Sequence, residues 1–347
     1  MNQTQFGAGR RPAPVTRRSR SAAAGSLLAM ALGLLAFGAP AAQASPDASN
    51  AAASGGYEAA FQASTGKLWV VHNSDAQNTG LGMMPGTSPA VVGLRGGGYE
   101  VAFQANTGFL WVVGADGAHN TGLGMKAGTS PAIAGVAGGG YEVAFQANTG
   151  FLWTAGVGGT HNTGLGMKAG TSPALASLSD GGYEATFQAN TGIMWVVGSG
   201  GAHSSGLGMA AGTSPAITGL SGGGYVATFQ ANTGFLWTAG AGGTHNTGLG
   251  MKAGTSPAIA GLADGGYEAT FQANTGFLWT AGVGGTHNTG LGMAAGTSPA
   301  IAGLTGGGYE ATFLANTGFL WTAGAGGSHN TGLGVKAGTS PEVTGLS

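Results

Sequence analysis

Aromatic and aliphatic residues alternate with small or polar residues along most of the chain, and the pattern recurs every 42 residues. In the second copy, residues 99–105 alternate, Asn-Thr-Gly follows at 106–108, and residues 109–113 alternate again. A period of two predicts β-strands, and a three-residue turn ending in glycine predicts a hairpin between them. Residues 121–125 and 131–136 predict an outer and an inner strand, so each copy has four strands.

Seven tryptophans mark the copies, and the spacing between them never changes. Residues 54–347 contain seven copies of 42 residues, and a period of about 40 to 45 residues with strand-like content is typical of propeller blades. The sequence therefore predicts an all-β fold over 54–347, a seven-bladed β-propeller of four-stranded antiparallel blades. The tryptophans are Trp69, Trp111, Trp153, Trp195, Trp237, Trp279 and Trp321.

The two ends of the repeat array predict how the ring closes. The array opens with a second strand at Tyr57 and finishes with an inner strand over 339–345. We expect the C-terminal strand to pair into the N-terminal blade, because this pairing removes an exposed sheet edge.

The hairpin register predicts two different blade faces. If Phe103 lies opposite Trp111, the aromatic residues share one face, and Glu100 with several small or aliphatic residues takes the other. Blades stack face to face, so we expect the aromatic face of one blade to pack against the opposite face of its neighbour. Each tryptophan is accordingly predicted to belong mainly to the core between blades.

The N-terminal 44 residues have the pattern of a secretory signal. Five arginines precede an apolar run over 22–37, and Ala-Gln-Ala at 42–44 forms a cleavage-like site. We expect residues 1–44 to be a signal peptide, 45–53 a short linker, and the protein to be secreted, without a membrane span after cleavage. The general secretory route is favoured, and Arg17-Arg18 keeps the twin-arginine route open.

Composition restricts the partners. After residue 44 the chain has six basic and twelve acidic residues, which argues against nucleic acid. Only 7% of all residues are charged, and the loops are rich in Gly, Asn, Thr and Ser, so the surface suits neutral ligands. The chain has no cysteine, so packing and ring closure must stabilise it without disulfides.

The segment Ala-Asn-Thr-Gly-Phe-Leu-Trp resembles the Asp-box turn of sialidases and other propellers, S/T-x-D-x-G-x-x-W. Together with Gly-Thr-Ser-Pro-Ala-Ile-Ala, it makes the repeats similar to the bacterial PLL-like lectin propellers over about 85% of the chain. The resemblance implies seven blades with shallow saccharide pockets between adjacent blades. Where that family usually carries Asp, this chain has Asn106 and its copies, with Ser64 in the first repeat.

Strand order predicts a binding rim. The loop entering the second strand and the loop between the third and outer strands lie at one end of the ring, which places a carboxylate, an imidazole and an amide together near stacked aromatics. Such groups suit sugar hydroxyls. Four copies carry the whole set: Glu100, His119 and Asn120; Glu142, His161 and Asn162; Glu268, His287 and Asn288; Glu310, His329 and Asn330.

These residues also have purely structural interpretations. The Glu can satisfy polar groups of a neighbouring blade, and the His can simply end a strand. The other three copies are incomplete, since Gln77 replaces the histidine in the first, Ser204 follows His203 in the fourth, and Val226 replaces Glu in the fifth.

Other chemistries fit poorly. One histidine per blade spaces the imidazoles too widely for metal ligation. Each copy also offers essentially one Glu, whereas a glycosidase needs two carboxyl groups about 5 to 10 Å apart. We therefore expect no enzyme activity, cofactor or metal, and predict a secreted, multivalent, lectin-like propeller that binds glycans of unknown identity. The alternative is a non-catalytic structural or protein-interaction propeller of the cell envelope or extracellular space.

Overall fold

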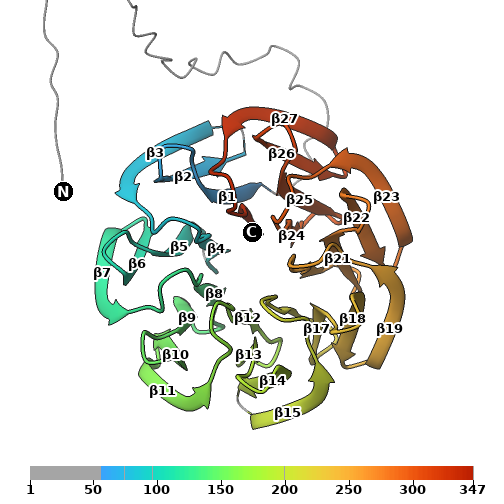
Figure 1. Ribbon diagram of the computed structural model, residues 1–347. Coiled ribbons are helices and arrows are strands. Elements are labelled where there is room, and N and C mark those ends of the chain that lie inside the picture. Colours follow the sequence, from blue (N-terminus) through green and yellow to red (C-terminus); the bar gives the residue numbers. More distant parts are fainter. Residues whose placement is uncertain (1–55, 74, 96, 199, 347) are drawn as a thin grey trace, which may run out of the picture. The chain divides into compact units, whose positions relative to one another are not determined.

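Seven four-stranded antiparallel sheets surround a central opening (Figure 1). The structure is a computed structural model that describes residues 56–73, 75–95, 97–198 and 200–346. The predicted seven-bladed propeller is confirmed. The predicted signal peptide and linker lie outside the described residues. Across the described ranges, no helix is long and apolar enough to cross a membrane.

Each blade contributes an inner strand that borders the opening and a second strand that pairs with it. The inner strands are β4 (Ala90–Gly93), β8 (Ala132–Gly135), β12 (Ala174–Ser177), β16 (Ala216–Gly219), β20 (Ala258–Gly261), β24 (Ala300–Gly303) and β28 (Glu342–Gly345). The second strands are β1 (Tyr57–Gln62), β5 (Tyr99–Gln104), β9 (Tyr141–Gln146), β13 (Tyr183–Gln188), β17 (Tyr225–Gln230), β21 (Tyr267–Gln272) and β25 (Tyr309–Leu314).

The third and outer strands complete each blade. The third strands are β2 (Lys67–His72), β6 (Phe109–Gly114), β10 (Phe151–Gly156), β14 (Ile193–Gly198), β18 (Phe235–Gly240), β22 (Phe277–Gly282) and β26 (Phe319–Gly324). The outer strands are β3 (Asp75–Gly82), β7 (Gly117–Gly124), β11 (Gly159–Gly166), β15 (Gly201–Gly208), β19 (Gly243–Gly250), β23 (Gly285–Gly292) and β27 (Gly327–Gly334).

The central hairpin of each blade has the predicted register. In blade 2, which consists of β4 to β7, Phe103 lies opposite Trp111. The Ala105 N–H donates to the Phe109 carbonyl at 2.9 Å, and Gly108 takes a φ of 84°, which glycine adopts without strain.

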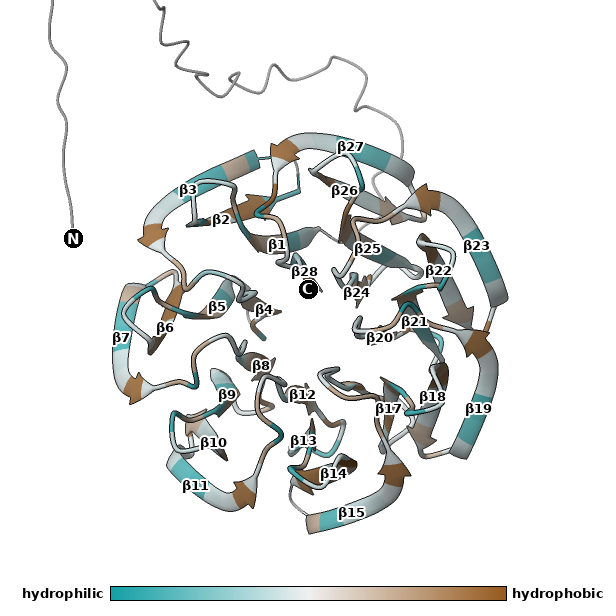
Figure 2. Ribbon diagram, viewed as in Figure 1, coloured by the Kyte–Doolittle hydropathy of each residue, from teal (hydrophilic) through white to brown (hydrophobic). Residues whose placement is uncertain are grey.

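The outer strand is longer than the alternation predicts. It begins at Gly117 instead of residue 121, and its register against β6 shifts between Phe109 and Trp111. Figure 2 shows the outer strands as mostly neutral or hydrophilic, with a hydrophobic segment near the arrowhead. The first half was missed because Gly-Ala-His-Asn has no alternation of hydrophobic and polar residues, so backbone pairing alone makes it a strand.

Hydrophobic contacts run between blades, as the two-face prediction requires. Val101 and Phe103 of blade 2 pack against Ala60, Leu68 and Val70 of blade 1, and equivalent clusters fill other interfaces. Phe103 is 0% exposed, whereas Trp111 is partly buried at the margin of its cluster. The tryptophans therefore contribute to the core, but the phenylalanines of the second strands form its centre.

The C-terminal strand closes the ring as predicted. β28 pairs antiparallel with β1, placing Tyr57 opposite Gly345 and Ala60 opposite Glu342. Seven serines just before the inner strands add a second closure, because the N–H of six of them donates to the Oγ of the serine 42 residues further on. The last bond joins the Ser340 N–H to Ser88 Oγ at 3.0 Å and completes a circle.

Candidate functional site

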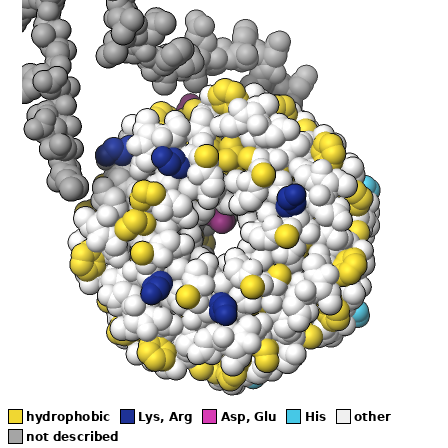
Figure 3. Space-filling model, viewed as in Figure 1, with side chains coloured by type: hydrophobic (Ala, Val, Ile, Leu, Met, Phe, Trp, Pro, Cys, Tyr) yellow, Lys and Arg dark blue, Asp and Glu magenta, His cyan; other side chains and the backbone are white. Residues whose placement is uncertain are grey.

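The two ends of the ring carry opposite charges. We call the end with the turn at 106–108 and its copies the asparagine end, and the opposite end, with the loops that enter the second strands, the glutamate end. All five lysines of the described residues lie at the asparagine end: Lys67, Lys126, Lys168, Lys252 and Lys336. Figure 3 shows Lys and Arg side chains spread around the opening on the viewed face.

Ten acidic residues and Arg95 lie at the glutamate end. The acids are Glu58, Asp75, Glu100, Asp116, Glu142, Asp180, Glu184, Asp264, Glu268 and Glu310. The predicted Glu and His residues therefore lie at a strongly acidic end.

Blade 3, which consists of β8 to β11, shows how the predicted Glu and His come together. Glu142 lies opposite Gly156, and His161 lies opposite Thr154, so all these positions share one blade face. Glu142 is only 2% exposed. Burial raises the pKa of its carboxyl, while the Thr154 hydroxyl, the Gly158 N–H and protonated His161 each act to lower this pKa. The carboxylate therefore lies beneath the surface, with the exposed imidazole above it.

The same pairing recurs in blades 6 and 7. Burial raises the pKa of Glu268 and of Glu310, and the charges of His287 and His329 act in the opposite direction. The nearby Thr280 hydroxyl also acts to lower the pKa of Glu268. This hydroxyl is buried, and its position does not meet the geometric limits of a hydrogen bond. The structure thus brings the predicted Glu and His together in blades 3, 6 and 7.

Blade 2 differs from this pattern. Burial, and after it the negative charge of Asp116, raise the pKa of Glu100 to about 7. His119 shares the blade face with Glu100 by register, since it lies opposite Val112. The charged neighbour that acts on the Glu100 carboxyl is Asp116. Blade 2 therefore presents two carboxyl groups, where blades 3, 6 and 7 present a carboxyl and an imidazole.

Blade 1 has a Glu–His pair that the repeat pattern does not predict. Its histidine comes from the end of the third strand, where other copies have glycine, and His72 lies opposite Glu58. His72 Nδ1 is 2.9 Å from Glu58 Oε2. The only sequence signal was the departure of His72 from the glycine found at Gly114 and its copies. Among the described residues, a Glu–His contact therefore occurs in blade 1, whereas in blades 3, 6 and 7 the histidine acts on the Glu carboxyl through its charge.

Each paired histidine of the outer strands also has a structural contact. The Nε2–H of His161 donates to the Gly158 carbonyl at 2.7 Å, and His287 and His329 make the equivalent bonds at 3.1 and 3.2 Å. These bonds hold the hairpin between the third and outer strands, which agrees with part of the structural interpretation of the histidines. These bonds use Nε2 of each ring, so Nδ1 remains available to a ligand.

The predicted asparagines do not join the Glu and His. Asn162 lies opposite Trp153, hence on the other blade face from His161. Its Oδ1 accepts the Gly164 N–H at 2.9 Å, and Asn120, Asn288 and Asn330 make the equivalent local bonds. The register shift in the outer strand accommodates this local turn.

A tyrosine of the next blade faces several of the carboxyls. Burial raises the pKa of the Tyr141 phenol, and the Glu100 carboxylate raises it further across the interface. Glu184 acts in the same way on Tyr225, and burial together with Glu310 raises the pKa of Tyr57 to about 12. Sequence reasoning missed this partner because it placed Tyr and Glu of one blade on opposite faces without following the Tyr to the neighbouring blade.

Shallow pockets lie between blades on the outer side of these tyrosines. Between blades 2 and 3, a pocket of about 400 Å³ is bordered by Thr121, Leu123, Tyr141 and Thr160. Between blades 6 and 7, an equivalent pocket of about 240 Å³ is bordered by Thr280, Thr289 and Tyr309. Hydroxyl groups and one aromatic ring therefore recur in both pockets, while the Glu and His side chains lie outside their walls.

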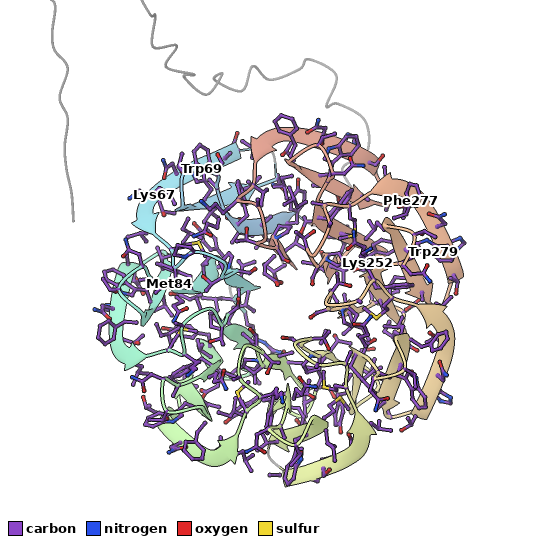
Figure 4. All side chains as sticks on the ribbon, in the orientation of Figure 1. Lys67, Trp69, Met84, Lys252, Phe277 and Trp279 are labelled. Carbon is purple, nitrogen blue, oxygen red and sulfur yellow. The ribbon has the colours of Figure 1, made fainter. Side chains whose placement is uncertain are left out.

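A different pocket lies at the asparagine end between blades 5 and 6. It measures about 230 Å³ and is bordered by Asn274, Thr275 and Trp279. Trp279 Nε1 is buried without a hydrogen-bond partner, and Phe277 beside it is 39% exposed. Figure 4 shows both aromatic residues at the periphery of their blade, with Lys252 nearer the central opening. This exposed ring was not predicted, because hydrophobic alternation places Phe277 on the same blade face as Trp279, which is expected to pack between blades.

Among the residues that the structure describes, no group of three or more His, Cys, Asp or Glu side chains is placed to hold a metal ion. No protein-family model matches the chain, and no curated protein sequence matches it.

Solved structures do match, at low sequence identity. A fungal lectin from Aleuria aurantia, described as a six-bladed propeller with a novel mode of fucose recognition, has 15% identity, covers 72% of this chain and 96% of its own, and has a TM-score of 0.54. The SapL1 lectin in complex with α-methyl fucoside has 13% identity, the same coverages and a TM-score of 0.51. AofleA from Arthrobotrys oligospora has 12% identity, covers 74% and 89%, and has a TM-score of 0.51.

The fold is shared with fucose-binding lectin propellers. The matched 72% of this chain is about 250 residues, the length of six of its seven repeats. The match therefore fits a six-bladed neighbour aligned to a seven-bladed ring. The likeness to these lectins concerns the fold, and the resemblance to the PLL-like lectins in particular stays a prediction.

Proposed function

We propose that this protein is a secreted, non-catalytic, multivalent lectin that binds neutral saccharides in the pockets between blades at the glutamate end. The observation that carries the proposal is the recurrence of one pocket type, lined by hydroxyl groups and a tyrosine, at the interfaces of blades 2–3 and 6–7. Its shared fold with fucose-binding lectins supports the same reading.

The chemistry of these pockets suits a sugar. The tyrosine offers a ring face for the apolar side of a pyranose, and threonine hydroxyls both donate and accept hydrogen bonds. His119 and His287 are exposed on the blade faces that border these two pockets, and Glu100 and Glu268 lie on the same faces. The acidic residues at this end repel anionic glycans, so neutral sugars are favoured.

Several weak sites on a rigid ring give strong binding to a glycan-coated surface. Once one site is occupied, the others meet neighbouring glycans at high effective concentration, which increases avidity by a hundredfold or more, roughly, without new contacts. We expect agglutination or retention on immobilised polysaccharide.

A glycan array with two sets of variants tests the proposal. Replacing His119 and His287 together by Ala should weaken binding to neutral glycans about tenfold or more, and sialylated glycans should bind poorly throughout. The matched control replaces the exposed Phe109 and Phe277 of the same blades by Ala, which leaves the glutamate end intact. Circular dichroism confirms that each variant is folded.

The outcomes separate the alternatives. Binding lost only in the phenylalanine set would move the saccharide sites to the pockets at the asparagine end. Absence of binding to every glycan by the folded protein would overturn the lectin proposal. The second candidate, a protein-interaction propeller, is favoured in that case by the exposed rings of Phe109, Phe151, Phe235, Phe277 and Phe319.

A further inference from the structure

The axis of the ring holds a cavity that is separate from the pockets between blades. It measures about 270 Å³ and is bordered by residues near the start of the seven inner strands and by the serines before them. Figure 3 shows the hollow at the centre of the viewed face, with an acidic side chain inside it. Glu342 is the charged residue among those that border the cavity.

The seven serines give the cavity a ring of hydroxyl groups. Each Oγ accepts the N–H of the serine in an adjacent blade at 2.9 to 3.0 Å. A hydroxyl oxygen has two lone pairs and one hydrogen, so this bond leaves one lone pair and one donor. Within the described residues, no acceptor lies within hydrogen-bond distance of these serine hydroxyls. The ring therefore has hydrogen-bonding capacity that a ligand can use.

Glu342 breaks the sevenfold symmetry of this cavity. The other six copies have alanine at this position: Ala90, Ala132, Ala174, Ala216, Ala258 and Ala300. Glu342 begins β28 directly after Pro341, so its side chain lies next to the serine ring. No hydrogen-bond partner for its carboxyl lies among the described residues, and burial raises its pKa to about 8. The Glu342 side chain is partly buried, and its carboxyl lacks a counter-charge that would compensate its desolvation.

We propose that the axial cavity binds one small ligand carrying a protonated primary amine, with Glu342 as its counter-ion and the serine ring as its hydrogen-bond partner. An ammonium group has three donors, which the carboxylate and the free lone pairs of the serine oxygens accept. Its charge compensates the partly buried carboxylate, so the gain on binding is larger than for a neutral alcohol of the same size. Only one amine binds per ring, because the other six positions are alanine.

The surrounding charges do not supply this counter-ion. The five lysines lie at the same end of the ring, but none of them borders the cavity. Burial is the cause of the raised Glu342 pKa, and no lysine acts on it. The ligand must therefore bring the positive charge.

Calorimetric titration of the full-length protein with ethanolamine tests the proposal, and ethylene glycol serves as the neutral probe. We expect one ethanolamine per ring, binding that is about tenfold or more weaker in Glu342→Ala, and no comparable binding of ethylene glycol. Choline should bind more weakly than ethanolamine, because a quaternary ammonium has no N–H donor. Alanine occupies this position in six copies, so Glu342→Ala should fold.

A transposed carboxylate provides the sharper control. The double variant Glu342→Ala, Ala132→Glu moves the acid to another blade of the same ring and should restore ethanolamine binding. Equal binding of both probes, or ethanolamine binding that survives Glu342→Ala, would overturn the proposal, as would no binding at all. The histidine variants that test the lectin sites should bind ethanolamine normally, so the two proposals can fail separately.

Discussion

In blades 3, 4, 6 and 7, room for the buried glutamate carboxyl comes from the glycine that ends the third strand of the same blade. A Cβ at Gly156 would overlap the Tyr141 carbonyl oxygen, and it would lie 2.5 Å from Glu142 Oε2. Gly198, Gly282 and Gly324 are equally enclosed by the tyrosine and glutamate of their own blades. Glycine is therefore required here by close approach, and not by a turn conformation.

We predict that Gly156→Ala destabilises the fold, whereas Gly158→Ala does not. The added methyl at position 156 meets the backbone, which cannot move without disturbing the strand pairing, and overpacking of this kind costs about 1 to 3 kcal/mol. At Gly158 the nearest atoms to a Cβ lie 4.0 Å away. Urea unfolding of the two variants measures the difference. Equal stability of both would show that the enclosure around Gly156 relaxes freely.

The repeat pattern predicts individual residues well only where the copies agree. It places Glu142 and His161 at one end of the ring, because strand order decides that. It fails for His72 and Glu342, which are informative because they depart from the other copies. A residue that differs from the other copies gives no periodic signal. Its role depends on which residues the fold places beside it.

At the level of elements, the hairpin between the second and third strands follows from the sequence, and the outer strand follows only in part. Hydrophobic alternation and the Asn-Thr-Gly turn determine the hairpin, since both are local. The first half of the outer strand is polar and Gly-rich, and its pairing with the third strand is what makes it extended. His119 and Asn120 are consecutive residues in the regularly paired part of this strand, so they lie on different faces once the strand is known to begin at Gly117.

We predict that a variant ending at Gly338 loses cooperative stability. The deletion removes β28 with its pairing to β1, the bond from Ser340 to Ser88 and the buried Val343 side chain. It also removes the 3.1 Å bond from the Gly93 N–H to Thr344 Oγ1. We expect the Tm measured by calorimetry to fall by about 10 °C or more, since several kcal/mol are lost from a domain of this size.

Two controls accompany this deletion. Thr344→Ala keeps the strand and removes one side-chain bond, so its Tm should fall by only a few degrees, roughly. A peptide covering residues 339–346 should raise the Tm of the truncated protein by pairing with the open edge of β1. A truncated protein that melts like the full chain would contradict closure by β28.

At the scale of the whole molecule, burial favours the protonated form of the glutamate carboxyl groups. Burial raises the pKa of all seven described glutamates, to about 7 for Glu100 and to about 8 for Glu342. In the unfolded chain these groups have pKa values near 4.5. Between pH 4.5 and 8 the folded protein therefore binds more protons than the unfolded protein.

By linkage, an excess of protons on the folded state means that stability falls as pH rises. We predict that the Tm is highest in mildly acidic solution, decreases between about pH 5 and 8, and levels off above pH 8. One pKa unit corresponds to about 1.4 kcal/mol, and partial exposure reduces the effect, so the total loss is on the order of a few kcal/mol. Calorimetry at constant ionic strength measures it.

Glu342→Ala and Glu100→Gln should each flatten the decline of the Tm with pH, chiefly by stabilising the protein at pH 8. Asp75→Asn, which removes an exposed acid, should leave the decline unchanged. A Tm that rises across this range would mean that the buried carboxylates find partners stronger than the cost of their burial.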